Sequence, residues 1–219
     1  MKERRQATRR VLDPMDRIAE VLFGLIMVLT FTGSLSAATS GREEIRTMLI
    51  GAIGCNLAWG IVDAAMFLMA QLSERGRGLL AYRTARHAGE PERARQAIAD
   101  ALPPVVASVL TTGELDTIRE RLRSQPEPPP VPRLRPDDWR GALGVLLLVF
   151  LSTFPVVIPF LLMQDARTAL RVSNAIAIAL LFLNGYALGR LAGHRPVRIG
   201  LLMVLIGTAL VAITIALGG

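Results

Sequence analysis

The sequence predicts an all-α polytopic membrane protein with five transmembrane helices and a small helical cytoplasmic insert between helices two and three. Hydrophobic residues make up 52% of its 219 residues, and the mean hydropathy is +0.43. These apolar residues gather into runs longer than a buried core helix needs, since about 20 apolar residues cross a bilayer. Most basic residues lie between or beside the runs, as charges that fix membrane orientation do.

Five apolar runs have the length of a membrane span. The first is accompanied by acidic residues and followed by four more runs, so we interpret it as an uncleaved helix and not as a secretory signal. The runs lie at residues 18–38, 47–71, 141–163, 172–192 and 199–218. They divide the chain into a basic cytoplasmic N-terminus (1–17), helices one and two (18–71), an insert (72–125), a proline-rich tether (126–140) and helices three to five (141–219).

The loop charges predict the orientation. Six basic residues precede the first run, and twelve arginines lie between the second and third runs. Three more, Arg190, Arg195 and Arg198, lie at the end of the fourth run or between the fourth and fifth. The other two loops carry two arginines each, with acidic residues beside them. Because basic loops stay in the cytoplasm, we expect the N-terminus inside and the C-terminus outside. For an arginine-rich chain without a cleavable signal, we expect a bacterial inner membrane.

The insert is the only sizeable polar segment. Its apolar spacing predicts that the second membrane helix continues to about Arg86 and that further helices cover residues 90–102 and 113–123. Thr111 and Glu114 have the spacing of a capping box. Six of the eleven residues 126–136 are proline, which predicts a stiff, extended tether.

Composition and motifs argue against several function classes. The formal charge of +7 is not interleaved with aromatic residues, so we do not expect nucleic acid as a partner. Cys55 is the single cysteine, which rules out an intrachain disulfide. His87 and His194 have no ligand partner at a useful spacing, and there is no phosphate-binding glycine loop or nucleophile triad motif. The sequence therefore indicates neither an enzyme nor a bound cofactor.

The second apolar run contains a buried ionisable residue, Asp63. It lies nine residues before Leu72, roughly 13 Å below the predicted cytoplasmic edge, and a charge there is costly. Asn56 lies seven residues earlier on the same side of the helix. We interpret Asp63 as a cation ligand or proton carrier, with Asn56 further along the same path. The alternative is that both residues only form hydrogen bonds between helices.

The first run offers further metal ligands. Glu20 lies at its cytoplasmic mouth, and Met27 lies roughly 15 Å deep, a depth similar to that of Asp63. A thioether beside a carboxylate could bind a borderline transition metal. Alternatively, Met27 is packing filler.

Two later runs carry signals for helix geometry. Pro155 and Pro159 predict a kink or break in the helix formed by the third apolar run. Gly185 and Gly189 predict close helix packing in the fourth, where we expect Ser173 and Asn184 to form hydrogen bonds between helices.

Four short stretches carry a family resemblance: Glu20-Val21-Leu22-Phe23-Gly24, Ser152 to Leu162, Leu181-Phe182-Leu183-Asn184-Gly185 and Leu205-Ile206-Gly207-Thr208-Ala209. They resemble segments of the vacuolar iron transporter family, whose members move Fe²⁺ or Mn²⁺ out of the cytosol. The order of parts is also similar: two spans, a helical cytoplasmic insert, then three spans. This resemblance implies a homodimer in the lipid bilayer.

The chain departs from the family pattern at the metal site. The family has an Asp three residues after the first-helix Gly, where this chain has Met27. The family's second-helix Met falls at or near Asp63, so the carboxylate and thioether have exchanged helices. The family's insert collects metal with glutamates, whereas residues 72–140 of this chain have twelve arginines against ten acids.

Together these observations predict a transporter that exports a divalent transition metal, Fe²⁺ or Mn²⁺, with possible coupling to protons. The predicted metal-site residues are Asp16, Glu20, Met27, Asn56 and Asp63. The alternative is a non-transporting scaffold of the same fold that binds lipid or a partner protein through the arginine-rich insert. A carrier of anions or phospholipids has less support, because no arginine lies deep in a span.

Overall fold

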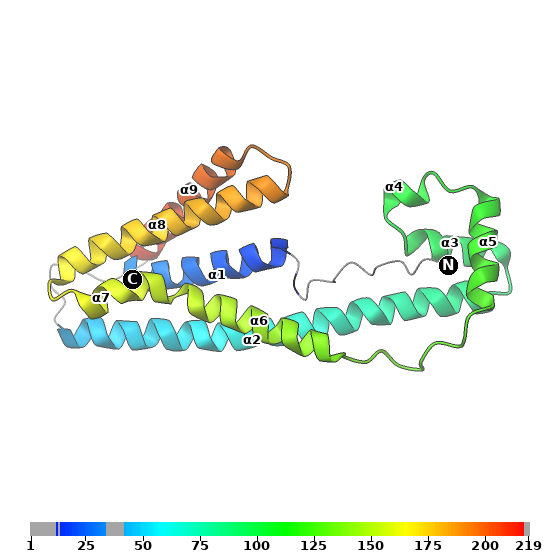
Figure 1. Ribbon diagram of the computed structural model, residues 1–219, viewed down its shortest axis with the longest axis horizontal. Helices are drawn as coiled ribbons and strands as arrows, with labels where there is room; N and C mark the ends of the chain where they lie inside the picture. Colours follow the sequence, from blue (N-terminus) through cyan, green and yellow to red (C-terminus); the bar gives the residue numbers. More distant parts are fainter. Residues whose placement is uncertain (1–11, 13, 34–41, 217–219) are drawn as a thin grey trace, which may run out of the picture. The chain divides into compact units, whose positions relative to one another are not determined.

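The computed structural model describes residue 12 and residues 14–33 and 42–216, and this part of the chain contains helices and no strand (Figure 1). The all-α prediction is confirmed. The helices are α1 (Pro14–Gly33), α2 (Arg42–His87), α3 (Pro91–Asp100), α4 (Pro104–Ala107), α5 (Thr112–Arg123), α6 (Pro136–Ser152), α7 (Phe154–Leu162), α8 (Ala166–Leu191) and α9 (Pro196–Ala216).

The chain divides into two compact units. One comprises residues 1–67 and 139–219, and the other comprises residues 68–138. Some predictions fall outside the described residues: most of the basic N-terminus (1–11 and 13), the end of the first predicted span (34–38) and the end of the last (217–218).

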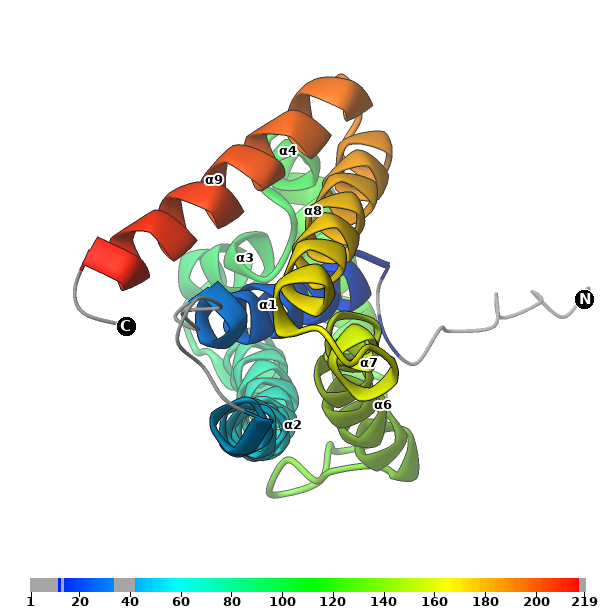
Figure 2. The ribbon, with the colours of Figure 1, turned by 90° about the vertical axis from the view of Figure 1, so that its left-hand side faces the viewer.

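In the first unit, α1 occupies the centre. It contacts α7, α8 and α9, and Figure 2 shows it between the α8–α9 pair and the helices α2, α6 and α7. Leu25 and Val28 of α1 are fully buried, and they pack in one core with Val156 of α7 and Leu181 of α8. The neighbouring helices therefore cover the apolar part of α1 on several sides, whereas Asp16 and Arg17 in its first turns are exposed.

Small residues bring α8 and α9 together, as the sequence predicts. A Cβ atom built on Gly185 would lie 2.9 Å from the Cα atom of Gly200, and one built on Gly189 would lie 2.8 Å from the Cα atom of Pro196. Real Cβ atoms do not approach backbone this closely. A larger side chain at either position would therefore push the two helices apart.

The predicted proline break is confirmed. Helix α6 ends at Ser152 and α7 begins at Phe154, with Thr153 between them. Nearby, the buried Ser173 hydroxyl of α8 donates to the carbonyl oxygen of Val156 in α7 at 2.7 Å, so its predicted interhelical hydrogen bond is present. Asn184 differs from the prediction, because its amide donates within its own helix to the carbonyl of Leu180.

Among the described residues, three helical segments are long and apolar enough to cross a membrane: Ile45–His87, Pro136–Leu162 and Ala166–Leu191. The segment Pro196–Leu210 is apolar but shorter. Helix α1 carries Asp16, Arg17 and Glu20 near its start, which lowers its hydropathy over a full span length. Length and composition thus identify three candidate spans in the described chain.

The second unit packs α3, α4 and α5 against the last turns of α2. Its small core contains Ala85, Ile98 and Leu115. The predicted capping box is confirmed, since the Thr111 hydroxyl accepts from the Glu114 amide and the Glu114 carboxylate accepts from the Thr111 amide at 2.8 Å. The four-residue helix α4 was not predicted, because it is too short for a periodic apolar pattern.

Arginines of the second unit donate mainly to backbone carbonyls. Arg83 Nη2 donates to the carbonyl oxygens of Pro129 and Pro130 at 2.9 and 2.8 Å, and Arg75 Nη1 donates to the carbonyl of Arg133 at 2.8 Å. Such tether carbonyls lack helical or sheet partners, and leaving one unpaired is costly once it is shielded from water. Part of the arginine excess therefore fastens the tether to α2.

Candidate functional site

Glu20 of α1 and Asp63 of α2 lie near each other where the two helices face, with Asp16 about one helical turn before Glu20. Asp16 and Glu20 lie four residues apart, on one face of α1. The Glu20 carboxyl group interacts electrostatically with the carboxyl group of Asp63 on α2 and with that of Asp16. Glu20 and Asp63 are both half-buried, whereas Asp16 is exposed. Neighbouring carboxylates repel each other, so this arrangement favours a cation or a proton between Glu20 and Asp63.

Two further contacts fix the register of α1 against α2. The rings of Phe23 and Trp59 meet edge to face with centroids 5.7 Å apart. One turn on, the Asn56 Nδ2 atom donates to the carbonyl oxygen of Gly24 at 3.3 Å. The helices therefore run antiparallel here, and Glu20 is the α1 residue beside Asp63.

The structure separates Met27 from Asp63. Met27 lies seven residues beyond Glu20, roughly 10 Å further along α1, and three residues beyond Gly24, the α1 residue that Asn56 contacts. Our estimate of equal depth assumed that both helices start at the same membrane level, and the observed register shifts them. The half-buried Met27 side chain thus follows the carboxylates along α1.

Asn56 is fully buried where three segments meet. Its Nδ2 atom donates to Gly24 of α1 and also to the Thr153 hydroxyl between α6 and α7. Its Oδ1 atom is buried without a hydrogen-bond partner. An acceptor in this state favours a donor or a cation, because an unpaired buried polar atom is costly.

Two glycines allow α1 and α2 to pack closely on α6 near Asn56. A Cβ atom on Gly24 would lie 2.6 Å from the carbonyl oxygen of Val149 in α6, and one on Gly60 of α2 would lie 3.2 Å from that of Leu146. Gly60 also lies between Asn56 and Asp63 on one face of α2. Both α1 and α2 therefore pack closely on α6 beside the candidate site.

Thr153 is the site residue that the sequence analysis missed. It is fully buried, and its hydroxyl is the side-chain partner of Asn56. Its position directly before Phe154-Pro155 was a usable signal, because a hydroxyl at a helix break can serve groups that prolines leave without donors.

A pocket of about 850 Å³ lies on the other side of Asn56, between the start of α2 and the helices α7 and α8. Glu43, Arg46 and Gln164 give it a polar rim. Its deeper lining includes Ile53 and Val157, which lie one helical turn from Asn56 and Thr153. Along α2, the Asn56–Thr153 contact thus separates this pocket from the carboxylates.

In the described chain, no three Asp, Glu, His or Cys side chains are close enough together to hold a metal ion. Glu20 and Asp63 could supply two oxygen ligands, and Mn²⁺ or Fe²⁺ would need water or other groups to complete its coordination.

The acids of the insert are largely engaged in structural pairs. Arg95 donates to Asp116 through Nε at 2.9 Å and Nη2 at 2.7 Å, and these hydrogen bonds hold the pKa of Asp116 below its ordinary value. The Thr111 amide likewise lowers the pKa of Glu114. Asp138 accepts from Arg75 Nη2 at 2.6 Å. These carboxylates stabilise the insert and are poorly suited to collecting metal.

A family sequence profile described as "VIT family" matches residues 87–219, more than half of the chain. The chain belongs to the vacuolar iron transporter family. No curated protein matches the sequence. The profile match covers α3 to α9, and three of the four resembling stretches of the sequence lie within it.

The five predicted metal-site residues lie outside the matched part, because α1 and most of α2 precede residue 87. Membership in a vacuolar iron transporter family indicates membrane metal transport in general terms. The residues that would carry the ion in this chain must therefore be argued from their own chemistry and positions.

Proposed function

We propose that this vacuolar iron transporter family member exports a divalent transition metal cation, Fe²⁺ or Mn²⁺, from the cytoplasm. The observation that carries the proposal is the register of α1 against α2, which places Glu20 beside Asp63 in a chain of this family. Hard oxygen ligands suit both ions. An ionisable residue on a membrane helix also marks an ion path more often than a packing contact.

In the proposed path, Asp16 and Glu20 attract the ion at the cytoplasmic mouth. Glu20 and Asp63 then bind it, which relieves the repulsion between the two carboxylates. The free Oδ1 atom of Asn56 receives the ion next, and the Met27 thioether follows roughly 5 Å beyond Gly24 along α1. When the Asn56–Thr153 contact opens, the ion enters the pocket rimmed by Glu43. Proton uptake by Asp63 as the ion leaves is part of the proposal.

The same proposal includes five spans, with α1 and α9 as the first and last. It places the protein as a homodimer in a bacterial inner membrane, with its N-terminus in the cytoplasm. Arginine counts in the loops support this orientation. The central position of α1 supports its assignment as a span, because its apolar residues pack in one core with α7 and α8.

The scaffold alternative has less support. It relies on the arginine-rich insert as a binding surface, yet Arg75, Arg83 and Arg119 all donate to carbonyls of their own unit.

The proposal is tested by reconstituting the purified protein into vesicles and following Mn²⁺ and Fe²⁺ entry with an enclosed metal-quenched dye. We expect both ions to enter faster than into protein-free vesicles, while Mg²⁺ does not. Simultaneous recording of internal pH tests proton exchange. Entry no faster than in protein-free vesicles, for every metal tried, would contradict the transport proposal.

A further inference from the structure

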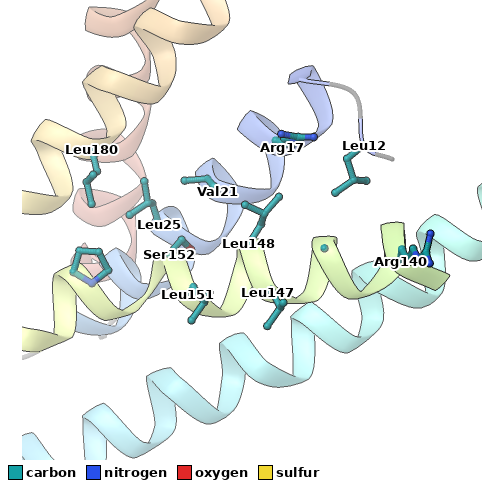
Figure 3. Close-up of a pocket in the computed structure, with 12 residues that line it drawn as sticks. Leu12, Arg17, Val21, Leu25, Arg140, Leu147, Leu148, Leu151, Ser152 and Leu180 are labelled. Carbon is teal, nitrogen blue, oxygen red and sulfur yellow. The ribbon is translucent and has the colours of Figure 1, made fainter. Parts of the chain in front are cut away.

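A second pocket lies on a different face of the first unit, between α1, α6, α7 and α8. Its volume is about 580 Å³, and its walls are almost entirely aliphatic (Figure 3). Leu147, Leu148 and Leu151 line it from α6, Val21 and Leu25 line it from α1, and Leu180 lines it from α8. None of the five predicted metal-site residues borders it.

The pocket is charged at one end only. Arg17, near the start of α1, and Arg140, near the start of α6, both line it, and Figure 3 shows them on the side of Leu12, away from Leu180. Within the described chain its lining includes no carboxylate. The loop charges place this end at the cytoplasmic surface of the membrane.

The length of this pocket matches the thickness of one bilayer leaflet. From Arg140 to Ser152 the α6 wall is roughly 18 Å long, while half of the hydrocarbon core is roughly 15 Å thick. The volume also lies within the roughly 300–1,000 Å³ of ordinary ligand pockets. An acyl chain would therefore reach along the leucines while its headgroup stays level with the arginines.

We propose that this pocket binds an anionic phospholipid of the cytoplasmic leaflet. The acyl chain fills the leucine-lined part, and the guanidinium groups of Arg17 and Arg140 bind the headgroup phosphate. Arginine suits this role because its planar group donates two parallel hydrogen bonds to phosphate oxygens. A zwitterionic headgroup of equal chain length gains less, because its ammonium group is repelled by the same arginines.

The test is native mass spectrometry of the full-length protein in mild detergent, after incubation with phosphatidylglycerol or phosphatidylcholine of identical acyl chains. We expect the wild type to retain phosphatidylglycerol preferentially. Arg17→Gln should lower the retention ratio of the two lipids about fivefold, as expected for one basic residue at an anionic membrane surface. Arg190→Gln is the matched control: it also removes an exposed arginine at a predicted cytoplasmic helix end, but outside the pocket.

Filling the pocket provides a second variant. A Cβ atom on Gly144 would meet only the flexible end of Leu12, at 2.9 Å, so Gly144→Leu should fold and should reduce retention of both lipids. The proposal is overturned if the wild type retains both lipids equally, or if Arg190→Gln lowers the ratio as much as Arg17→Gln. It is also overturned if Gly144→Leu dissociates a dimer without affecting lipid retention, because a second copy would then occupy the pocket.

Discussion

Asp63→Asn should reduce Mn²⁺ transport in reconstituted vesicles by at least tenfold, and by up to roughly a hundredfold. Changes to groups that only orient metal ligands already cost this much in affinity or activity, and Asp63 is proposed to bind the ion directly. Asparagine has nearly the same volume and retains one carbonyl oxygen, but it removes the negative charge beside Glu20. The packing of α1 on α2 should therefore survive.

A matched variant, Glu74→Gln, removes an exposed carboxylate from the same helix and should transport at the wild-type rate. Thermal melting of each variant separates a lost ligand from a lost fold. If Asp63 only joins helices, Asp63→Asn will either transport normally or melt at a lower temperature. Either result would assign Asp63 to packing.

Gly24→Ala should destabilise the protein by about 1–3 kcal/mol, the usual cost of overpacking a core. The added Cβ atom would lie 2.6 Å from the carbonyl oxygen of Val149, which belongs to backbone and cannot rotate away. It would also collide with the Ser152 hydroxyl. Helices α1 and α6 must then separate, and the hydrogen bond from Asn56 to the Gly24 carbonyl lengthens. Thermal unfolding in detergent measures the loss.

Gly54→Ala is the control for this prediction. Gly54 also lies inside a helix, but no atom lies within 4 Å of an added Cβ atom. Because alanine favours helix more than glycine does, this variant should be as stable as the wild type or more stable. Equal destabilisation by the two substitutions would contradict the close packing of α1 on α6.

Local features of the fold were predictable from neighbouring residues. The capping box of Thr111 and Glu114 depends on groups three residues apart, and the break at Thr153 follows from Pro155 and Pro159. The close approach of α8 and α9 follows from glycines spaced four apart. In each case, the residues that determine the feature lie within one or two helical turns of it.

The candidate site was only partly predictable, because its geometry depends on contacts between distant segments. The sequence identified Asp63, Asn56 and Glu20 as polar residues on apolar helices. It did not give the register that places Glu20 beside Asp63, since this depends on how Gly24 and Gly60 pack against α6. Hydrogen bonds from the insert arginines to tether carbonyls span 46 to 58 residues of sequence, so a count of charges did not reveal them.

The most direct test of the central claim is the Mn²⁺ affinity of four proteins: wild type, Glu20→Gln, Asp63→Asn and the double variant. If both carboxylates bind one ion, each single substitution should weaken binding at least tenfold, and the double variant should bind little more weakly than either one, because groups that share a ligand are not additive. Affinities that remain at the wild-type value in all three variants would contradict a shared metal site between α1 and α2.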